Sequence, residues 1–332
     1  MPTKTGLPRN FFSNLLGRIA PAHSAAPDSV PAARRPDVPR EALRIVESRS
    51  LSEFSARCSE IDLAAIGAFQ DSMLGVLIDL PINGYCACCR QLVRFDMPSQ
   101  CLQGSGNPQP PNWREELVCP HCQLNNRVRY CFSLLETVAG PNETSKIYLT
   151  EQVSRAFAWL KSQFAGTIGS EFFHGETVRR RLQDQLTFIT KDPSLRLHFE
   201  DLTALSFRND ETDVVLSFDV LEHVPDYRAA LRECHRILKK NGMLILSVPF
   251  IDSNQATIVR ATMDEHGEIN HLLEPELHGN SISEQGCLCF YHFGWDLVDD
   301  LRTAGFSDAY LASTWSPVLG HLGHISAFVA RK

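Results

Sequence analysis

The sequence lacks an apolar run of the roughly 18 to 20 residues that a membrane-spanning helix needs, and its stretch 73–82 is interrupted by Asp79. It also lacks a net positive charge: the formal charge is −7, so the whole chain offers no basic field that would hold nucleic acid. The apolar piece 11–16 is too short and too polar for a secretory signal. We therefore expect a cytoplasmic protein without a membrane span. No pattern indicates an oligomeric state.

A simple disulfide framework is missing as well. The chain has eleven cysteines, an odd number, and seven of them fall within residues 84–131. With 43% hydrophobic and 21% charged residues, the composition is that of an ordinary globular protein. A length of 332 residues favours a sizeable core with an appendage. The clustered cysteines point to a bound metal ion.

Composition changes along the chain and predicts four parts. Residues 1–40 hold seven of the nineteen prolines and a net charge of +4, which predicts a disordered tail. Apolar side chains at three-to-four spacing predict a helical segment over residues 41–83. Residues 84–131 form the cysteine-rich module, and residues 141–332 form the largest domain, with a long insert at 251–293.

The cysteine-rich module has the spacing of a zinc site. Two Cys-x2-Cys pairs, separated by 29 residues, supply four thiolates, and the predicted ligands are Cys86, Cys89, Cys119 and Cys122. Two such turns can surround one Zn²⁺ at about 2.3 Å, and four thiolates leave no open position, so we predict a structural ion. Alternative ligands are Cys88, Cys101 and His121. Arg90 and Gln123 stand where such turns usually have glycine.

Beyond residue 141, strand and helix patterns alternate. Strands are predicted at 146–150, 167–171, 195–199, 213–218, 243–249, 309–314 and 325–330. Helices are predicted at 152–164, 227–240 and 294–304, and Asn241-Gly242 is expected to end the second of them. This alternation predicts an α/β fold with a mostly parallel sheet and helices on both faces.

Residues 213–224 read DVVLSFDVLEHV, and residues 236–249 read RILKKNGMLILSVP. With these segments the region 146–332 resembles the class I S-adenosylmethionine-dependent methyltransferases of the type-eleven-like group. The resemblance implies a seven-stranded Rossmann-like sheet with an antiparallel last strand. It also implies S-adenosylmethionine as cofactor, bound across the carboxyl ends of the first four strands. Ligands of open α/β sheets are expected at that same edge.

Residues at the predicted strand ends are the candidates for cofactor binding. They are Thr150 and Glu151 for the ammonium group, Glu171 for the ribose, Asp201 with Leu202 for the adenine, and Phe218 with Asp219 for the amino-acid moiety. A carboxylate can accept hydrogen bonds from both ribose hydroxyls. Simpler alternatives remain: Glu171 as an exposed acid, Asp201 as a turn former and Asp219 as a cap of the next turn.

The first loop, residues 149–154, contains no glycine, whereas most members of the family have a glycine-rich loop there. A nicotinamide dehydrogenase is disfavoured for the same reason, because a pyrophosphate needs close backbone approach. The missing glycine leaves a non-catalytic adaptor with the same fold as an alternative. An RNA-modifying enzyme that uses Arg127 and Arg129 is a further alternative, although nucleic acid is not favoured.

On the acceptor side, His223 is the first candidate for a general base, with packing as its alternative role. The insert 251–293 is predicted to be a lid, and its segment EPELHGN resembles a feature of related methyltransferases, which makes His278 a second acceptor-side candidate. His271 and His278 are alternatively metal ligands, and plain turn chemistry is the third possibility. The expected acceptor is a small molecule, a glycan or a lipid-linked intermediate.

Overall fold

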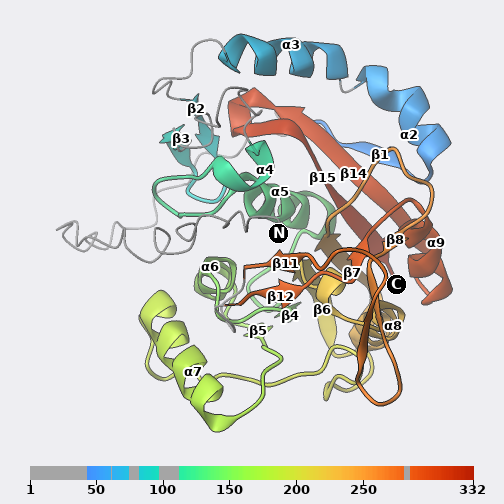
Figure 1. Ribbon diagram of the computed structural model, residues 1–332. Helices are drawn as coiled ribbons and strands as arrows, with labels where there is room; N and C mark the ends of the chain where they lie inside the picture. Colours follow the sequence, from blue (N-terminus) through green and yellow to red (C-terminus); the bar gives the residue numbers. More distant parts are fainter. Residues whose placement is uncertain (1–42, 61, 75–81, 97–111, 280–284) are drawn as a thin grey trace, which may run out of the picture. The chain divides into compact units, whose positions relative to one another are not determined.

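The computed structural model describes residues 43–60, 62–74, 82–96, 112–279 and 285–332, and residues 37–332 group as one compact unit. The predicted tail at 1–40 and Cys101 lie outside the described residues. Within the described part, a seven-stranded sheet has the order β1-β14-β15-β7-β6-β4-β5 (Figure 1). None of the described helices is long and apolar enough to cross a membrane.

The sheet strands are β1 (Val46–Ser48), β4 (Ile147–Leu149), β5 (Thr167–Gly169), β6 (Thr212–Phe218), β7 (Leu238–Ser247), β14 (Asp308–Ser316) and β15 (His321–Arg331). The helices used below are α2 (Leu51–Arg57), α3 (Leu63–Leu74), α4 (Trp113–Glu116), α5 (Asn126–Leu134), α6 (Arg155–Gln163), α7 (Glu176–Thr190), α8 (Tyr227–Ile237) and α9 (Asp296–Thr303). A short 3₁₀ helix, η5 (Leu221–His223), follows β6.

The sheet is mixed. β5, β4, β6 and β7 run parallel, whereas β15 is antiparallel to both of its neighbours and β1 is antiparallel to β14. The predicted antiparallel last strand is confirmed. Five of the seven strands, β4, β5, β6, β7 and β14, point the same way, so the prediction of a mostly parallel sheet is confirmed as well. The order and the helical cover are those of a Rossmann-like α/β fold.

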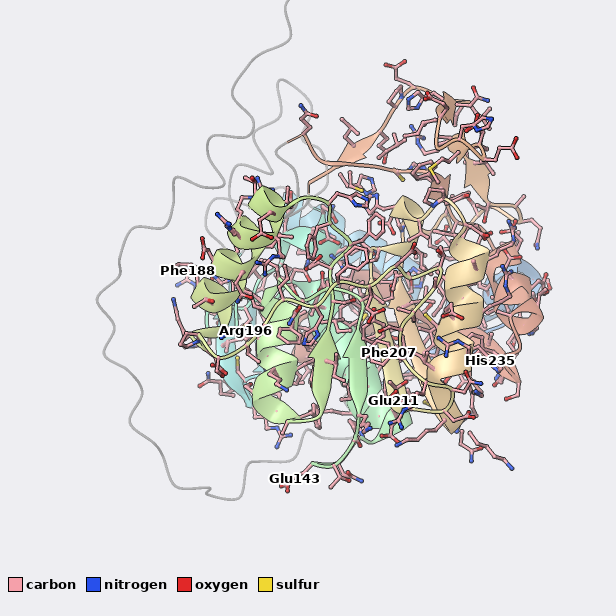
Figure 2. All side chains as sticks on the ribbon, turned by 90° about the horizontal axis from the view of Figure 1, so that it is seen from below. Glu143, Phe188, Arg196, Phe207, Glu211 and His235 are labelled. Carbon is pink, nitrogen blue, oxygen red and sulfur yellow. The ribbon has the colours of Figure 1, made fainter. Side chains whose placement is uncertain are left out.

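Helices cover both faces of the sheet, as the alternation predicts. On one face, α5, α6 and α7 pack against alternate strand residues such as Ile147, Leu216 and Ile245. On the other face, α2, α3, α8 and α9 pack against the intervening residues, including Tyr148 and Leu244. Phe207, labelled in Figure 2, lies against Tyr148 with ring centroids 4.7 Å apart. Burial on both faces explains why the strands read as continuous apolar runs.

The predicted strand at 195–199 does not form. Its only pairing is an isolated bridge between Glu171 and Phe199. Two glutamine side chains take the backbone amides instead: Gln183 accepts from the N–H of Leu197 at 2.9 Å, and Gln152 accepts from that of His198 at 2.8 Å. Because these amides are already satisfied, the segment does not need a ladder with β5.

The predicted helix at 227–240 ends three residues early, at Ile237, because Leu238 already pairs with Thr212 as the start of β7. Asn241-Gly242 therefore lies inside a strand, where Asn241 adopts a φ of +64° next to a register shift. Asparagine tolerates this left-handed conformation, which here forms a bulge in the strand and not the end of a helix.

The N-terminal part of the compact unit adds one unpredicted strand. The segment predicted as helical over 41–83 contains α2 and α3 but begins with β1, which extends the sheet beyond β14. Residues 75–81 lie outside the described part. Helix α5, at the end of the cysteine-rich module, is almost fully buried and belongs to the main core. The limits of the module itself stay a prediction.

Candidate functional site

The carboxyl ends of β5, β4, β6 and β7 meet at one edge of the sheet, which is the edge where open α/β sheets bind ligands. Several predicted cofactor residues lie there, each directly after a strand: Thr150 and Glu151 after β4, Glu171 after β5, and Asp219 after β6. The sequence thus placed these four residues at a common edge correctly, and their roles depend on what each side chain contacts.

Glu171 holds the loop after β4. Its Oε1 accepts hydrogen bonds from the backbone N–H groups of Gln152 at 2.9 Å and Val153 at 2.7 Å. Glu171 is only 8% exposed, so the alternative interpretation as an exposed acid is wrong. Burial raises the pKa of Glu171, although the two amide donors oppose the shift. Both of these hydrogen bonds use Oε1, which leaves Oε2 as the oxygen to offer a ligand.

The glycine that permits this loop lies on the neighbouring strand. A Cβ added to Gly169, at the end of β5, would come within 2.7 Å of the ring of Phe157 and 2.9 Å of the carbonyl oxygen of Glu151. The loop after β4 can therefore approach β5 closely only because residue 169 has no side chain. The glycine that the close approach requires therefore stands on β5 and not within the loop itself.

Glu151 and Thr150 complete the end of β4. Burial raises the pKa of Glu151 to about 7, while the nearby charge of Arg127 opposes that rise. Thr150 is buried, and its hydroxyl donates to Ser217 Oγ at 3.1 Å. Glu151 is therefore a carboxyl group at this edge of the sheet whose charge changes near neutral pH.

Asp219 is clamped by two arginines. Arg114 contacts both carboxylate oxygens, at 2.6 and 2.7 Å, and Arg127 Nε lies 3.3 Å from Oδ2. Ser247 donates to Oδ1 at 2.9 Å. Burial alone would raise the pKa of Asp219, but the two guanidinium charges outweigh it and hold this pKa well below its usual range. The predicted capping role is wrong, because η5 has no side-chain cap.

The two arginines come from the end of the cysteine-rich module, and Glu115 completes the network. Its carboxylate accepts from Arg127 at 2.8 and 3.1 Å. Arg129 is 1% exposed and donates to the backbone oxygens of Leu319 and Gly320. Arg127 and Arg129, the two arginines considered for RNA contacts, thus both bind to groups of the protein itself. No pattern in the sequence indicated that α4 and α5 deliver charges to the sheet edge.

The remaining predicted cofactor residues have mainly local contacts. Asp201 Oδ1 accepts from both the N–H and the hydroxyl of Thr203, at 2.8 and 2.7 Å, which is the turn-forming role. Leu202 is buried in the core below α8. Phe218 packs edge-on against Phe132 with centroids 5.8 Å apart, so only its main chain faces the edge. Their predicted contacts with the cofactor stay predictions.

The four predicted zinc ligands come together. Cys86 Sγ lies 3.9 Å from Cys122 Sγ, and Cys89 Sγ lies 3.7 Å from Cys119 Sγ. All four sulfur atoms are within 4.8 Å of one another. Sulfur ligands of a tetrahedral Zn²⁺ lie about 3.8 Å apart when the bonds are about 2.3 Å. The arrangement therefore fits one four-coordinate ion, and the exposed His121 is not part of it.

Both cysteine turns have a left-handed residue directly after the second thiol. Arg90 has a φ of +55° and Gln123 a φ of +61°. Their N–H groups donate to the carbonyls of Cys86 at 2.7 Å and Cys119 at 2.8 Å. The turns thus adopt the conformation that glycine usually supplies, at some cost in backbone strain. The missing glycines therefore make the two turns energetically less favourable but leave their backbone conformation unchanged.

The acceptor-side candidates His223 and His278 lie together, with ring centroids 5.1 Å apart. His223 follows β6 on η5, whereas His278 belongs to the insert on β11 (Leu277–His278). Phe290 donates its N–H to the carbonyl of Glu222, which fastens the insert to the end of β6. His271, the other histidine weighed as a ligand, is exposed and lies apart from this cluster.

The environment of His278 does not suit a general base. The neighbouring thiol of Cys289 and the carboxylate of Glu222 raise the pKa of His278 to about 11. The ring Nδ1 of His223 is bonded to the carbonyl of Leu288 at 2.8 Å, and its Nε2 faces Glu222. Glu222, which the sequence interpretation did not single out, is 0% exposed.

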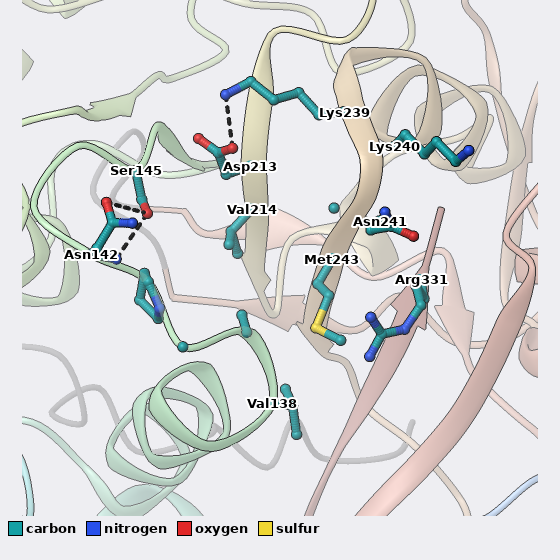
Figure 3. A pocket seen from close by; sticks show the side chains of 14 residues that line it. Val138, Asn142, Ser145, Asp213, Val214, Lys239, Lys240, Asn241, Met243 and Arg331 are labelled. Atoms are coloured by element: carbon teal, nitrogen blue, oxygen red, sulfur yellow. Dashed lines mark hydrogen bonds and ion pairs between the residues drawn. The ribbon is translucent and has the colours of Figure 1, made fainter.

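A pocket of about 270 Å³ lies at the opposite edge, by the starts of β6 and β7 (Figure 3). Asp213, on its wall, already accepts from Lys239 Nζ at 2.7 Å and from the N–H of Lys146 at 2.8 Å. This edge holds the amino ends of the parallel strands, so the pocket is not where the fold binds cofactors.

Comparison with known proteins finds a match to part of the chain. The model of a family described as a methyltransferase domain matches residues 154–246. No curated protein matches the chain. The match begins directly after the loop that Glu171 holds, so the glycine-free loop lies outside it.

Solved structures with low identity include several methyltransferases. An S-adenosylmethionine-dependent methyltransferase from Mesorhizobium loti is 13% identical, with a TM-score of 0.43, and the alignment covers 64% of this chain and 100% of that one. A 1,6-didemethyltoxoflavin-N1-methyltransferase from Burkholderia thailandensis, solved with S-adenosylhomocysteine, is 18% identical, with a TM-score of 0.37 and coverages of 62% and 78%.

The YcgJ protein from Bacillus subtilis is 17% identical, with a TM-score of 0.31. That alignment covers 36% of this chain and spans about half, 51%, of the YcgJ chain. The chain thus has a Rossmann-like sheet whose segment 154–246 is similar to the methyltransferase domain family.

Proposed function

We propose that the protein is an S-adenosylmethionine-dependent methyltransferase. The observation that carries the proposal is the row of acids at the carboxyl ends of β4, β5 and β6, within and beside the segment that matches the family. S-adenosylmethionine supplies a methyl group activated on a sulfonium sulfur. The residues of this chain then have to bind the cofactor, orient it and exclude water.

Glu171 is our candidate for the ribose. Its Oε1 is occupied by the amides of Gln152 and Val153, and its Oε2 is the oxygen that a ribose hydroxyl would use. Phe172 and Phe199 are 49% and 48% exposed, and their ring centroids lie 5.6 Å apart beside Glu171. Exposed aromatic rings next to a ribose site can stack with an adenine base. We assign Asp201 and Leu202 to the same end of the cofactor.

The amino-acid end of the cofactor belongs beside β4 and β6. Glu151 and the hydroxyl of Thr150 are our candidates for the ammonium group, since a carboxylate stabilises a cation at that point. Arg127 is our candidate for the cofactor carboxylate, because a guanidinium pairs well with a carboxylate and this one lies at the sheet edge beside Asp219. Asp219 positions both arginines, and the main chain of Phe218 borders the methyl-transfer position.

The acceptor would enter from the side of the insert. His223 and His278 border that side, and the nitrogen contacts described above favour positioning over proton transfer. A small molecule or glycan remains the expected acceptor, and a cytoplasmic location the expected setting. The zinc ion that we assign to Cys86, Cys89, Cys119 and Cys122 is structural, because four thiolates leave no position for a substrate.

A non-catalytic adaptor is the second candidate. It is favoured by one observation: the family match does not include the loop after β4, and Glu171 uses one carboxylate oxygen to hold that loop. In an adaptor, this bond would be the whole function of Glu171. The two candidates differ in whether Oε2 binds a ribose.

Glu171→Gln separates these candidates. The amide oxygen of glutamine can still accept both backbone N–H groups, but the NH₂ group that replaces Oε2 cannot accept from a hydroxyl. We expect wild-type protein to bind S-adenosylhomocysteine in isothermal titration. Glu171→Gln should keep the melting temperature within a few degrees and weaken binding at least about 10-fold, because a charge-assisted hydrogen bond is lost.

Glu176→Gln is the matched control, because this acid lies five residues further on, at the exposed start of α7. It should bind as the wild type does. Wild-type protein that is folded and loaded with zinc but gives no heat with S-adenosylhomocysteine would favour the adaptor. Equal affinity of Glu171→Gln and wild type would remove Glu171 from the ribose site.

A further inference from the structure

The side chains of Glu222, His223 and His278 face one another beside the end of β6 but form no hydrogen bond with one another. The ring nitrogens His223 Nε2 and His278 Nδ1 each lie 3.7 Å from the same oxygen, Oε1 of Glu222. All three atoms lie within 4.8 Å of one another. A distance of 3.7 Å is too long for a hydrogen bond. Ligand atoms on a tetrahedral metal ion lie about 3.4 Å apart when the bonds are about 2.1 Å, which is close to this spacing.

Glu222 is the unexplained group of this cluster. Its residue is 0% exposed, and neither of its carboxylate oxygens has a hydrogen-bond partner. A buried carboxylate without a partner is strongly unfavourable, so such groups are normally paired or coordinate a metal. The carboxylate of Glu222 faces the inner nitrogen of each imidazole ring.

The outer nitrogen of each ring is already fixed by an oxygen acceptor. His223 Nδ1 is 2.8 Å from the carbonyl of Leu288, and His278 Nε2 is 2.9 Å from the carboxylate of Glu276. These contacts fix the orientation of each ring, so that with an ion bound the outer nitrogen would keep its proton and the inner nitrogen, which faces Glu222, would bind the metal. Metal-binding histidines are held in the same way, by a carbonyl or carboxylate behind the ring.

We propose that Glu222, His223 and His278 bind a divalent transition-metal ion, with Zn²⁺ the best match to two imidazole nitrogens and one carboxylate. Three protein ligands leave a fourth position open, in contrast to the four-thiolate site. The ion joins η5, at the end of β6, to β11 of the insert, and so fixes the insert over the sheet edge. His278, whose side chain is 30% exposed, provides the route for the ion from solvent.

A second group, formed by Glu276, His278 and Cys289, shares one histidine with this site. We assign the ion to Glu222 and not to Glu276, because Glu276 is already paired. Its carboxylate lies 3.2 Å from Arg260 and 3.0 Å from His292. Glu276 then acts behind His278, as the acceptor that orients the ring.

Zinc content tests the proposal without any assay of methyl transfer. Full-length protein is stripped with a chelator, reconstituted with Zn²⁺, desalted and measured by mass spectrometry of the metal. Glu222→Gln and His278→Ala should each hold one ion fewer per chain than the wild type, and the apparent Kd for that ion should rise at least about 100-fold. His271→Ala, which changes an exposed histidine of the same insert, should hold as many ions as the wild type.

Cobalt provides the second measurement. Co²⁺ added to wild type that carries a single equivalent of Zn²⁺, which the four-thiolate site takes first, should give weak visible bands of a nitrogen and oxygen site, and Glu222→Gln treated in the same way should lack them. Circular dichroism of each variant verifies folding; His278→Ala changes a partly exposed side chain and should fold even if Glu222→Gln does not. Equal zinc content in the wild type and in folded His278→Ala would overturn the proposal. Because no cofactor is added, this outcome is independent of whether the protein binds S-adenosylmethionine.

Discussion

Glu171 and Gly169 together shape the loop after β4. Two hydrogen bonds to its Oε1 fix the loop after β4, and Gly169 provides the space for the loop beside β5. The sequence allowed us to predict that an acid follows β5 at the binding edge. It did not show the bond to the loop, because that bond depends on the register of β4 and β5 and not on any local motif.

Side-chain networks were the part of the site that sequence reasoning missed. The four thiols could be predicted, since their spacing alone brings two sulfur atoms of each turn together. Arg114, Glu115 and Glu222 could not, because their partners lie on distant elements and only the fold places them together. The sequence offered Arg127 only as a candidate for RNA contacts, whereas its side chain faces Asp219.

Glu151 gives a prediction about pH. Burial raises the pKa of this carboxyl group from 4.5 to about 7, so the folded protein binds a proton there that the unfolded chain releases. This contribution to stability is fully present below pH 4.5 and is lost as the pH rises through about 7. Glu151→Gln should therefore be more stable than the wild type at pH 8, by about 1 to 3 kcal/mol, and about equally stable at pH 4.5.

Chemical denaturation of both proteins at the two pH values measures this difference. Subtracting the free energy of unfolding of the wild type from that of the variant at each pH cancels the titration of the other groups. A gap of the same size at pH 4.5 and pH 8 would show that Glu151 does not have a raised pKa.

Elements were predicted well where burial enforces them. Strand β6 and helix α9 lie close to their predicted ranges. Their apolar side chains recur with the period of a strand or a helix, and these side chains are buried in the core. The errors occurred where backbone groups found partners other than the expected ones. The amides at 195–199 bond to two glutamine side chains, and Leu238 pairs with β6 before α8 can continue. Such competition cannot be read from propensities.

Gly169→Ala tests the packing of the loop after β4 against β5. The added Cβ would lie 2.9 Å from the carbonyl oxygen of Glu151, closer than real Cβ contacts, so the loop has to move. We expect a loss of about 1 to 3 kcal/mol in stability and a parallel loss of cofactor affinity. Thermal unfolding and titration with S-adenosylhomocysteine measure the two effects.

Gly67→Ala is the control, because a Cβ at this position of α3 meets nothing within 4 Å. Alanine is the better helix former, so this variant should be as stable as the wild type or slightly more stable. If Gly169→Ala behaved like Gly67→Ala, the close approach of the two elements would not matter to the site.

At the scale of the whole molecule, the cysteine turns and the sheet edge form one structure. Trp113 and Leu117 pack with Cys86 and Cys119 in a small core, and Arg114 extends from the same short helix to Asp219. Loss of the zinc ion should therefore also disturb the sheet edge at which we propose that the cofactor binds. Cys119→Ser should lower the melting temperature by about 10 °C or more and weaken cofactor binding, because structural zinc contributes directly to folding.

Cys58→Ser is the matched substitution, since this thiol on the short helix after α2 is not part of the four-thiol cluster. Calorimetry should show a much smaller change. Similar melting temperatures for Cys119→Ser and the wild type would indicate that the cysteine turns hold together without an ion.

The central claim is that a sheet edge without the customary glycine loop binds the adenosyl group through Glu171. A crystal structure of the zinc-loaded protein with S-adenosylhomocysteine tests it most directly. The account predicts the ligand at the carboxyl ends of β4 and β5, with a ribose hydroxyl within hydrogen-bond distance of Glu171 Oε2. A ligand bound instead in the pocket beside Asp213, or no ligand in a well-ordered crystal soaked at millimolar concentration, would contradict it.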